Sequence, residues 1–319
     1  MELYKLENDF LRVTFLTTGA TIYTFEVKPL NYRNIVLSTK DISHYKTPDN
    51  GYFGASVGPV AGRLKEGKFL LNGVTYHTEQ NEKVTNTLHG GFHSFAFKEF
   101  NVLVETNDQL VFEYNTAEDE GGFPGMMSLR VIYTLKENGL ELNYQARCTK
   151  DTIINITNHS YFNLDGGGNI LDHTLKMNAT AVYELDEKQI NIKPIKVKRN
   201  SVFNVRNDRK LKDIVLNEEV NKAPTMGLDH LFMVSDGVLT LTTKDLTLVV
   251  SANYPGYQLY STNFPPQFPL INNEPVNLYH GLAIEPVALV TSNTFEYKNL
   301  ELKALDTYEK AITYEVIIL

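Results

Sequence analysis

The chain has 319 residues, of which 42% are hydrophobic and 21% are charged, and no run approaches the roughly 18 consecutive apolar residues that a membrane helix needs. These values exclude a transmembrane, coiled-coil or disordered protein. The net charge of -8 argues against nucleic acid as a partner, and the single cysteine, Cys148, permits neither an internal disulfide nor a thiolate metal cluster. Because the first residues lack the basic and apolar regions of a signal peptide, we expect a cytoplasmic protein with no membrane partner.

The predicted elements are mostly strands. The chain holds 18 Tyr and 17 Phe, residue types that favour strands, and short apolar runs recur from one end to the other. In chain order, the strand-like runs cover residues 11–15, 22–27, 69–76, 110–114, 129–135, 140–144, 152–157, 238–242, 247–251, 257–260, 282–285 and 312–318. Asn72-Gly73 and Asn138-Gly139 stand between such runs and predict two hairpins.

Helical periodicity is scarce. The best candidate covers residues 208–219, where Leu211, Ile214 and Val215 share one face of a short helix. No fixed-period repeat and no linker rich in Pro, Gly or Ser divides the chain. We therefore expect a single all-β domain over residues 1–319, a large antiparallel β structure with little helix. The long irregular stretches in which a site is usually assembled are residues 41–62, 118–125, 190–229 and 265–277.

The richest polar segment covers residues 152–166. If one strand runs through it, Ile154 and Ile156 share a face, and the polar side chains of the other face are Asn155, Thr157, His159, Tyr161 and Asn163. One interpretation is an ordinary strand with a solvated side. The other is the wall of a groove whose amides, hydroxyls and imidazole suit a polyhydroxylated ligand.

Glu285 stands inside the apolar run of residues 281–290, directly before Pro286. An ionised Glu is costly to bury without a partner, so this carboxylate is either paired in the interior or exposed at a strand end where the proline interrupts the ladder. In the interior its pKa is raised, which is the property that a general base near neutral pH requires.

Three further polar residues remain open to two interpretations. His89 precedes a Gly-Gly pair that permits a sharp turn and a close approach, but its segment has no spacing typical of metal ligands. Arg63 follows Gly62, and Asp229 precedes an apolar strand. Either of these two could form an ordinary ion pair in a loop. Taken singly, none of these residues decides the function.

Taken together and in this order, the segments resemble the aldose 1-epimerases, also called galactose mutarotases. The resemblance covers most of the chain and rests on Gly62-Arg63-Leu64, Gly67 to Gly73, Leu88-His89-Gly90-Gly91, Asn158-His-Ser-Tyr-Phe-Asn-Leu164, Asp229-His230, Gln258 to Asn263 and Ile284-Glu285-Pro286. The string from Asn158 to Leu164 is the most specific of these motifs. The resemblance implies a β-supersandwich, a large β-sandwich whose open face holds a free sugar.

The resemblance also implies Glu285 as the general base, His159 as the general acid and His89 as an aid near the ring oxygen. Mutarotation removes the proton of the C1 hydroxyl and protonates the ring oxygen, after which the open aldehyde turns and recloses. One acid and one base suffice, so we expect no cofactor and no metal. If the site is partly closed, we also expect the negative charge of Glu285 to hold the pKa of His159 above about 6.5.

For substrate binding, the resemblance implies Arg63 and Asp229 as residues that hold sugar hydroxyls, and we expect Asn163 to join them. The chain departs from the family pattern in three places. Gly62 stands where the family usually has Asn, residues 287–293 differ from the usual run after the Glu-Pro pair, and residues 190–193 occupy the approximate place of a Pro-Thr-Gly region.

Four functions remain open. The leading one is an aldose 1-epimerase that interconverts the α and β anomers of a free aldohexose such as galactose or glucose. A hexose 6-phosphate mutarotase would need several basic groups, and no Arg cluster lies beside His89 or His159 in the sequence. The altered segment after Glu285 favours a carbohydrate-binding or sensing protein without turnover. A glycoside hydrolase would use Asp229 and Glu285 as a carboxylate pair.

Overall fold

The computed structural model describes residues 1–48, 51–82, 85–290 and 295–319. Strands recur throughout these residues and the α-helix α1 covers only Lys212–Val215, so the predicted all-β fold is confirmed. The predicted helix over residues 208–219 is too long, because Arg209–Lys210 form the strand β19 and pair with β17 (Thr174–Leu185).

Within the described residues, no helix is long and apolar enough to cross a membrane. The short 3-10 turns are η1 (Lys28–Leu30), η2 (Ile42–Lys46), η4 (Lys65–Gly67), η5 (Gly91–His93), η6 (Phe95–Phe97), η7 (Glu120–Gly122) and η8 (Lys298–Leu300).

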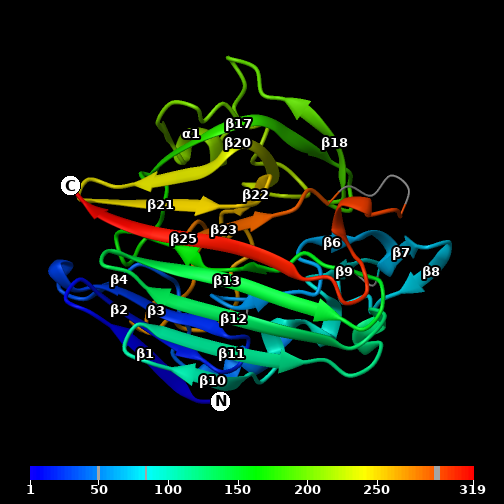
Figure 1. The fold of residues 1–319 in the computed structure, drawn as a ribbon. Coiled ribbons are helices and arrows are strands. Elements are labelled where there is room, and N and C mark those ends of the chain that lie inside the picture. The colour runs from blue at the N-terminus through cyan, green and yellow to red at the C-terminus, as the bar shows by residue number, and fades with distance from the viewer. Residues whose placement is uncertain (49–50, 83–84, 291–294) are drawn as a thin grey trace.

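In the described part of the chain, an antiparallel sheet of 13 strands runs through the molecule (Figure 1). The path of hydrogen-bonded neighbours is β10 (Asn101–Glu105), β11 (Gln109–Asn115), β12 (Met127–Leu135), β13 (Gly139–Cys148), β25 (Tyr308–Ile318), β21 (Leu246–Ala252), β20 (Asp229–Thr242), β22 (Gly256–Tyr260), β23 (Leu282–Val287) and β16 (Tyr161–Phe162). Beside β20, the strands β17, β18 (Asn191–Lys196) and β19 extend this sheet.

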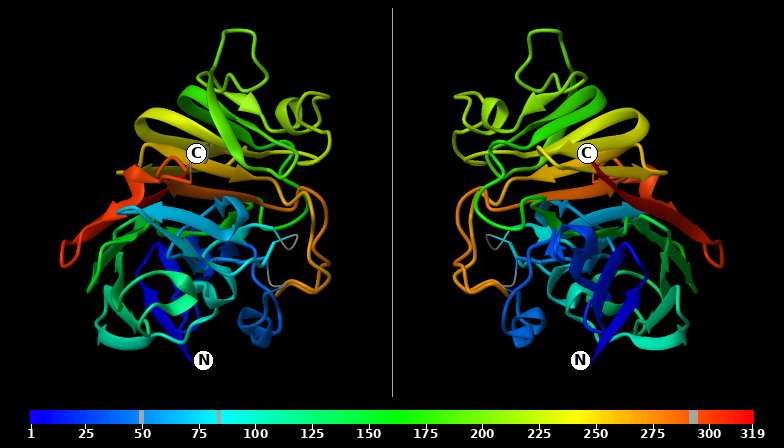
Figure 2. Two further views of the ribbon diagram at one scale, coloured as in Figure 1. Left: turned by 90° about the vertical axis from the view of Figure 1, so that its right-hand side faces the viewer. Right: turned by 90° about the vertical axis from the view of Figure 1, so that its left-hand side faces the viewer.

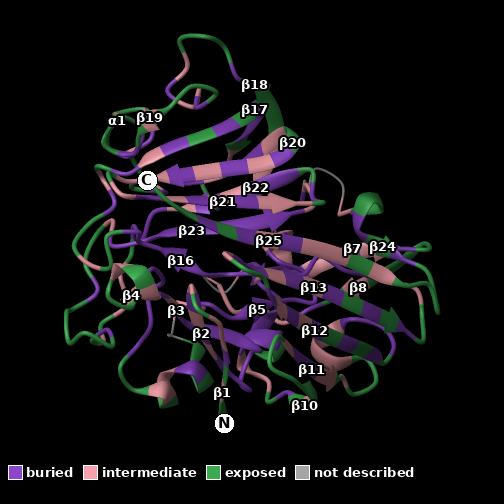
Figure 3. Cartoon of the chain, turned by 60° about the vertical axis from the view of Figure 1, so that its left-hand side comes forward, coloured by how far each residue is buried: buried purple, intermediate pink, exposed green. Residues whose placement is uncertain are grey.

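A second sheet packs against the large sheet near the N-terminus. Its strands are β1 (Leu3–Glu7), β2 (Leu11–Leu16), β3 (Thr21–Val27) and β4 (Arg33–Asn34). Phe15 of β2 and Tyr133 of β12 are both fully buried, and their ring centroids lie 4.5 Å apart. Alternate residues of β12 from Met127 to Leu135 are buried in the same core, as the alternating colours along the strands indicate (Figure 3). The two layers form the expected β-sandwich.

Both predicted hairpins are present. The first joins β7 (Lys68–Leu71) to β8 (Val74–His77) through Asn72 and Gly73, both of which have positive φ, as a two-residue hairpin turn requires. The second joins β12 to β13, and Gly139 is the first residue of β13 rather than a turn residue with positive φ. A Cβ atom at Gly139 would lie 2.6 Å from the carbonyl oxygen of Tyr314, so glycine there permits the close approach of β25.

Residues 152–157 do not form one strand, so that prediction is wrong, and the condition that one strand runs on to Asn163 is not met either. It contains β14 (Thr152–Ile153), β15 (Thr157–Asn158) and β16, which pair with β24 (Glu301–Leu302), β5 (Ser56–Val57) and β23 respectively. Because the chain turns from one partner to the next, alternate residues do not share a face. The predicted solvated side is absent as well, since Asn155 and Thr157 are fully buried.

Short strands and long loops from the first half of the chain lie against the strands of the second half. The strand β6 (Arg63–Leu64) pairs with β9 (Thr87–Leu88), so these two loops meet side by side. The segment between β17 and β20, which contains most of the predicted loop 190–229, projects from the end of the molecule opposite the N-terminus (Figure 2). These loops and the strands β20, β22 and β23 surround the site described next.

Candidate active site

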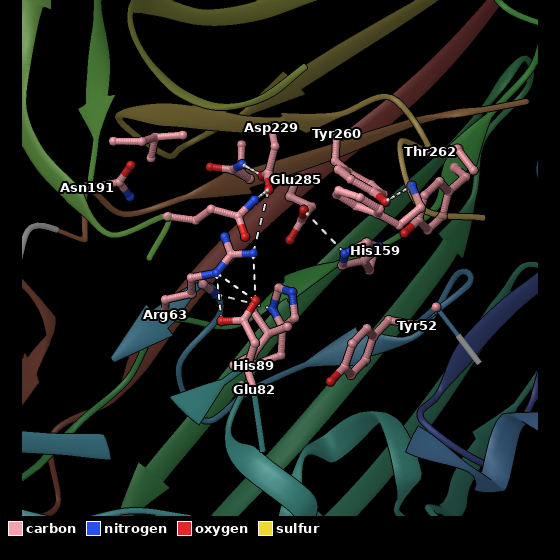
Figure 4. Close-up of a pocket in the computed structure, with 18 of the residues that line it drawn as sticks. Tyr52, Arg63, Glu82, His89, His159, Asn191, Asp229, Tyr260, Thr262 and Glu285 are labelled. Atoms are coloured by element: carbon pink, nitrogen blue, oxygen red, sulfur yellow. Dashed lines mark hydrogen bonds and ion pairs between the residues drawn. The ribbon is translucent and has the colours of Figure 1, made fainter. Parts of the chain in front are cut away.

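A cavity of about 360 Å³ lies between the start of β20, the end of β22 and the loops of the first half of the chain. Five of the six residues expected at the site line this cavity, namely Arg63, His89, His159, Asp229 and Glu285 (Figure 4). All of them except Arg63 are buried. The fold therefore gathers polar and titratable groups from distant parts of the sequence into one enclosed space.

The register of the large sheet places two carboxylates on one face. Gln258 of β22 lies opposite Glu285 of β23, and Asp229 of β20 lies opposite Tyr260, two residues further along β22. Residues two apart on a strand share a face, so Asp229, Gln258 and Glu285 point in the same direction. Ile284, which precedes Glu285, faces the core and is fully buried. Strand periodicity thus directs both carboxylates into the cavity.

Glu285 lies in the interior of β23, which continues through Pro286 to Val287. The alternative of an exposed Glu at an interrupted strand end is wrong, because this side chain is 2% exposed. Among the residues that the structure describes, β16 pairs with Leu282 and Ala283 of β23, so at Pro286 the pairing described for β23 is with β22 alone. Proline is tolerated at such an edge position.

Glu285 and His159 lie side by side in the cavity. His159 Nε2 lies 3.4 Å from Glu285 Oε1 (Figure 4). Burial raises the pKa of Glu285 well above its usual range, an effect that Asp229 reinforces and Arg63 opposes. Burial lowers the pKa of His159 to about 4, so the expectation that Glu285 holds this pKa above 6.5 is wrong. The loss of water outweighs the attraction between the two groups, and both shifts favour the uncharged form of each side chain.

His89 is held in one tautomer by the backbone. Its Nδ1 accepts a hydrogen bond from the amide of Gly62 at 3.2 Å, and its own amide donates to the Gly62 carbonyl at 3.0 Å. Since Nδ1 is an acceptor, the proton of the neutral ring lies on Nε2. Burial lowers the pKa of His89 well below its usual range, and His159 and Arg63 act in the same direction. His89 is therefore a neutral hydrogen-bond donor through Nε2.

Two glycines permit this backbone arrangement. Gly90 has a φ of 92°, and a Cβ atom there would lie 2.1 Å from the carbonyl oxygen of Gly58, which confirms the expected close approach. Gly62 has a φ of 84°, but among the described residues a Cβ atom there would come within 4 Å of Val290 Cγ2 alone, at 3.9 Å. Asn adopts positive φ more readily than most residues, so Gly62 and the family's usual Asn satisfy the same backbone requirement.

Asp229 is oriented by two side-chain amides. Gln258 Nε2 donates to Oδ1 at 2.6 Å and Gln189 Nε2 donates to Oδ2 at 3.1 Å. Gln189 comes from the turn between β17 and β18, and Arg63 Nη2 lies 3.6 Å from Oδ2. These contacts fix the plane of the Asp229 carboxylate.

The group His89, His159 and Glu285 also has the composition of a metal site. The candidate ligand atoms lie within 4.8 Å of one another, and two imidazoles with one carboxylate suit zinc or iron. The tautomer of His89 does not fit this use, because Gly62 occupies Nδ1 and Nε2 carries the proton. A ligating imidazole must offer a lone pair, so these residues fit hydrogen bonding and proton transfer rather than metal binding.

Asn163 does not join the other five residues. Its amide donates to the carbonyl oxygen of His280 at 2.7 Å and also contacts the carbonyl oxygens of Gly167 and Gly168, and it is not among the residues that line the cavity. These bonds brace the loop that follows β16. The expectation depended on a continuous strand, in which His159 and Asn163 would share a face.

Several residues of the cavity were not expected from the sequence. Glu82 pairs with Arg63, Gln189 and Gln258 hold Asp229, and the ring centroid of Tyr52 lies 4.8 Å from that of His89. Gln258 alone carried a signal, because it belongs to one of the motifs that support the family resemblance. The other three lie in loops, where periodicity does not indicate the direction of a side chain.

Two of the three departures from the family pattern meet at the rim of the cavity. Asn191, from the altered residues 190–193, donates to the carbonyl oxygen of Val290, from the altered run after Glu285. Asn191 Oδ1 is buried and has no hydrogen-bond partner within the described part of the chain. Residues 291–293 of that run lie outside the described residues.

Comparison with known proteins identifies relatives over most of the chain. The family model for aldose 1-epimerase matches residues 2–315. The aldose 1-epimerase of Haemophilus influenzae is 32% identical over 312 residues, which cover 93% of this chain and 90% of that protein. The galactose mutarotase of Mus musculus is 33% identical over 277 residues, which cover 83% of this chain and 78% of the mouse protein.

Solved structures share the fold. The GalM/aldose epimerase homologue of C. elegans has a TM-score of 0.90 at 24% identity, over 100% of this chain and 99% of that chain. The galactose 1-epimerase of Lactobacillus acidophilus NCFM has a TM-score of 0.86 at 24% identity, over 98% of this chain and 93% of that chain. These likenesses confirm the expected galactose mutarotase-like β-sandwich. Together with the family match over nearly the whole sequence, they lead to one conclusion: the chain belongs to the aldose 1-epimerase family, whose members are isomerases.

Proposed function

We propose that this protein interconverts the α and β anomers of a free aldohexose of the galactose or glucose type. The observation that carries the proposal is the contact between His159 Nε2 and Glu285 Oε1, 3.4 Å apart and buried in the cavity. The C1 hydroxyl and the ring oxygen of a pyranose are bonded to the same carbon. A proton acceptor and a proton donor at this separation can therefore serve both oxygens of one bound sugar.

The proposed reaction moves one proton through the sugar. The carboxylate of Glu285 takes the proton of the C1 hydroxyl while the imidazolium of His159 protonates the ring oxygen. The bond between C1 and the ring oxygen breaks, and C1 becomes the carbonyl carbon of an aldehyde. The pair has then passed its single proton from His159 to Glu285. After rotation about the C1–C2 bond, the reverse transfers close the ring on the other face.

The directions of the two pKa shifts favour these transfers. Burial raises the pKa of Glu285, which makes its carboxylate a stronger base. Burial lowers the pKa of His159, which makes its imidazolium a stronger acid. The uncharged pair, which accompanies the open aldehyde, is also the form that a dry cavity stabilises. We infer that burial of both groups, rather than an ionic attraction between them, prepares the site for catalysis.

The surrounding residues bind and orient the sugar in this proposal. His89 offers its Nε2 proton to an oxygen of the sugar near the catalytic pair. Asp229, whose plane is fixed by Gln189 and Gln258, accepts hydrogen bonds from hydroxyl groups, and Arg63 donates to them. These are the interactions that a neutral polyhydroxylated ligand can satisfy.

The charges of the cavity favour an unphosphorylated sugar. Arg63 is the one Lys or Arg among the described residues that line it, and Glu82, Asp229 and Glu285 are there as well. A sugar phosphate would meet these carboxylates without the cluster of cations that usually binds phosphate. The amide bonds to both oxygens of Asp229 likewise disfavour its use as the second carboxylate of a glycoside hydrolase.

Polarimetry tests the proposal. Fresh α-galactose and α-glucose should reach anomeric equilibrium faster with the protein than without it, and the final rotation should not change. Methyl galactoside should remain unaltered, because it has no C1 hydroxyl proton to lose. Release of a phenol from an aryl galactoside would indicate a hydrolase, and acceleration confined to glucose 6-phosphate would indicate a phosphate-specific mutarotase. Saturable sugar binding with an unaccelerated trace would indicate a binding protein.

A further inference from the structure

Glu82 is an acid of the cavity to which the proposed reaction assigns no part. Arg63 Nε lies 2.9 Å from Glu82 Oε2 and 3.0 Å from Oε1, and Arg63 Nη2 lies 2.9 Å from Oε1 (Figure 4). The two side chains are only 14% and 17% exposed. Charge-assisted bonds that engage two nitrogens of one guanidinium hold it in a defined plane. Glu82 is therefore a closer partner of Arg63 than Asp229, which lies 3.6 Å away.

The backbone holds Glu82 in this place. The side chain of the preceding residue, Asn81, accepts the Leu88 amide at 2.7 Å and donates to the Leu88 carbonyl at 3.1 Å. Leu88 in turn pairs with Arg63 in the two-stranded sheet of β6 and β9. The Glu82 amide donates to the carbonyl of Asn86 at 3.2 Å. The loop that carries Glu82 is thus fastened to the strand beside Arg63, independently of any ligand.

The charge of Arg63 bears on the catalytic pair. The charged or titratable side chains near Glu285 besides His159 include Arg63 from β6, Asp229 from β20 and His89, which follows β9. The phenols of Tyr161 from β16 and Tyr314 from β25 also interact electrostatically with Glu285. The neutral Gln258 lies opposite it on β22, and Tyr161 and Tyr260 also line the cavity. Of these groups, Arg63 supplies the positive charge that opposes the raised pKa of Glu285. A carboxylate bonded directly to Arg63 offsets that charge.

We propose that Glu82 is a positioning residue: it fixes the direction of the Arg63 guanidinium and offsets its charge at the place where Glu285 and His159 exchange protons. The proposal rests on the proposed function for its kinetic readouts. It assigns Glu82 two separable effects. The geometric effect orients Arg63 for a hydrogen bond to a sugar hydroxyl. The electrostatic effect sets the pH range in which Glu285 and His159 together hold one proton.

Two substitutions at the same position separate these effects. Glu82→Gln keeps the length of the side chain but removes its charge, so it should raise KM by roughly 10-fold and move both limbs of the pH profile to lower pH by roughly 0.5 to 1 unit. Both limbs move in this direction because added positive charge makes every proton of the pair easier to lose. Glu82→Asp keeps the charge but shortens the reach, so it should raise KM and leave the limbs in place.

The matched control is Glu79→Gln. Glu79 accepts a bond from His93 Nδ1 at 2.8 Å, is partly exposed and does not line the cavity, so this variant should match the wild type in KM and pH profile. A Glu82→Gln variant with unmoved limbs, or a Glu79→Gln variant with the same shift, would overturn the proposal. If Glu82→Gln does not fold, Glu82→Asp still tests whether Glu82 orients Arg63. An unchanged KM in Glu82→Asp would overturn that part of the proposal.

Failure of the proposed function can be told apart from failure of the proposal for Glu82. A wild-type protein without mutarotase activity refutes the function, and the part of Glu82 is then tested by calorimetry with galactose. Weaker binding to Glu82→Asp than to Glu79→Gln supports the proposal, and equal binding to the two contradicts it.

Discussion

Replacement of Glu285 with Gln should lower activity and raise stability at alkaline pH. In an unfolded chain a Glu ionises near pH 4.3. Burial raises the pKa of the folded Glu285 well above that value. Between the two pKa values the folded state keeps a proton that the unfolded state has released, so the free energy of unfolding falls as pH rises. The fall is about 1.4 kcal/mol for each unit that separates the two pKa values, and Gln is not subject to it.

The size of the effect can be converted to a melting temperature. An unfolding entropy of about 2.1 cal/mol/K per residue gives roughly 670 cal/mol/K for the whole chain, so each pKa unit corresponds to about 2 °C in Tm. Calorimetry should find equal Tm values for the two proteins near pH 4 and a higher Tm for Glu285→Gln at pH 8. Polarimetry should find activity lowered by about 10²- to 10⁴-fold. A lower Tm than wild type at pH 8 would contradict the raised pKa of Glu285, and near wild-type mutarotation would show that Glu285 is not the general base.

Three more predictions concern the same site. His159→Asn should lower kcat by about 10²- to 10⁴-fold while calorimetry still finds galactose binding; parallel loss of binding would make His159 a binding residue only. A plot of kcat/KM against pH should fall below about pH 4, where His159 takes up a second proton for the pair. It should also fall at alkaline pH, where Glu285 loses the one remaining proton. An acid limb near pH 6.5 would contradict the lowering of the His159 pKa by burial. Gly62→Val should lose about 1 to 2 kcal/mol of stability because φ is 84°, while Gly62→Asn should lose little; equal Tm values for the two would refute this explanation.

The strands and hairpins could be predicted because their signals are local. Asn72-Gly73 adopts the two positive φ values that its turn needs, and the alternation from Met127 to Leu135 matches the burial of β12. For Glu285 the apolar run reduced the environments to two, a paired interior position or an exposed strand end, and only the structure shows that the side chain is buried. His89, Arg63 and Asp229 were predicted as site residues because their motifs resemble those of the aldose 1-epimerase family.

The remaining features depend on contacts between distant segments. The chain between Thr152 and Asn163 is divided because three different strands pair with it, and nothing in its own sequence specifies them. Glu82 is positioned through Leu88 and Arg63, which pair only in the folded state. The lowered pKa of His159 results from burial, and the sequence indicates a neighbouring carboxylate more readily than the exclusion of water.

We propose that one protein-bound pair, Glu285 and His159, opens and recloses the ring of a free sugar without changing the balance between its anomers. Magnetisation transfer by NMR between the C1 signals of α- and β-galactose, labelled with ¹³C at C1 and already at equilibrium, tests this most directly. Exchange should be faster with the wild-type protein than in buffer, the intensities of the two signals should not change, and exchange with Glu285→Gln should be close to the protein-free rate. Exchange with the wild-type protein no faster than in buffer, or equally fast with both proteins, would contradict this proposal.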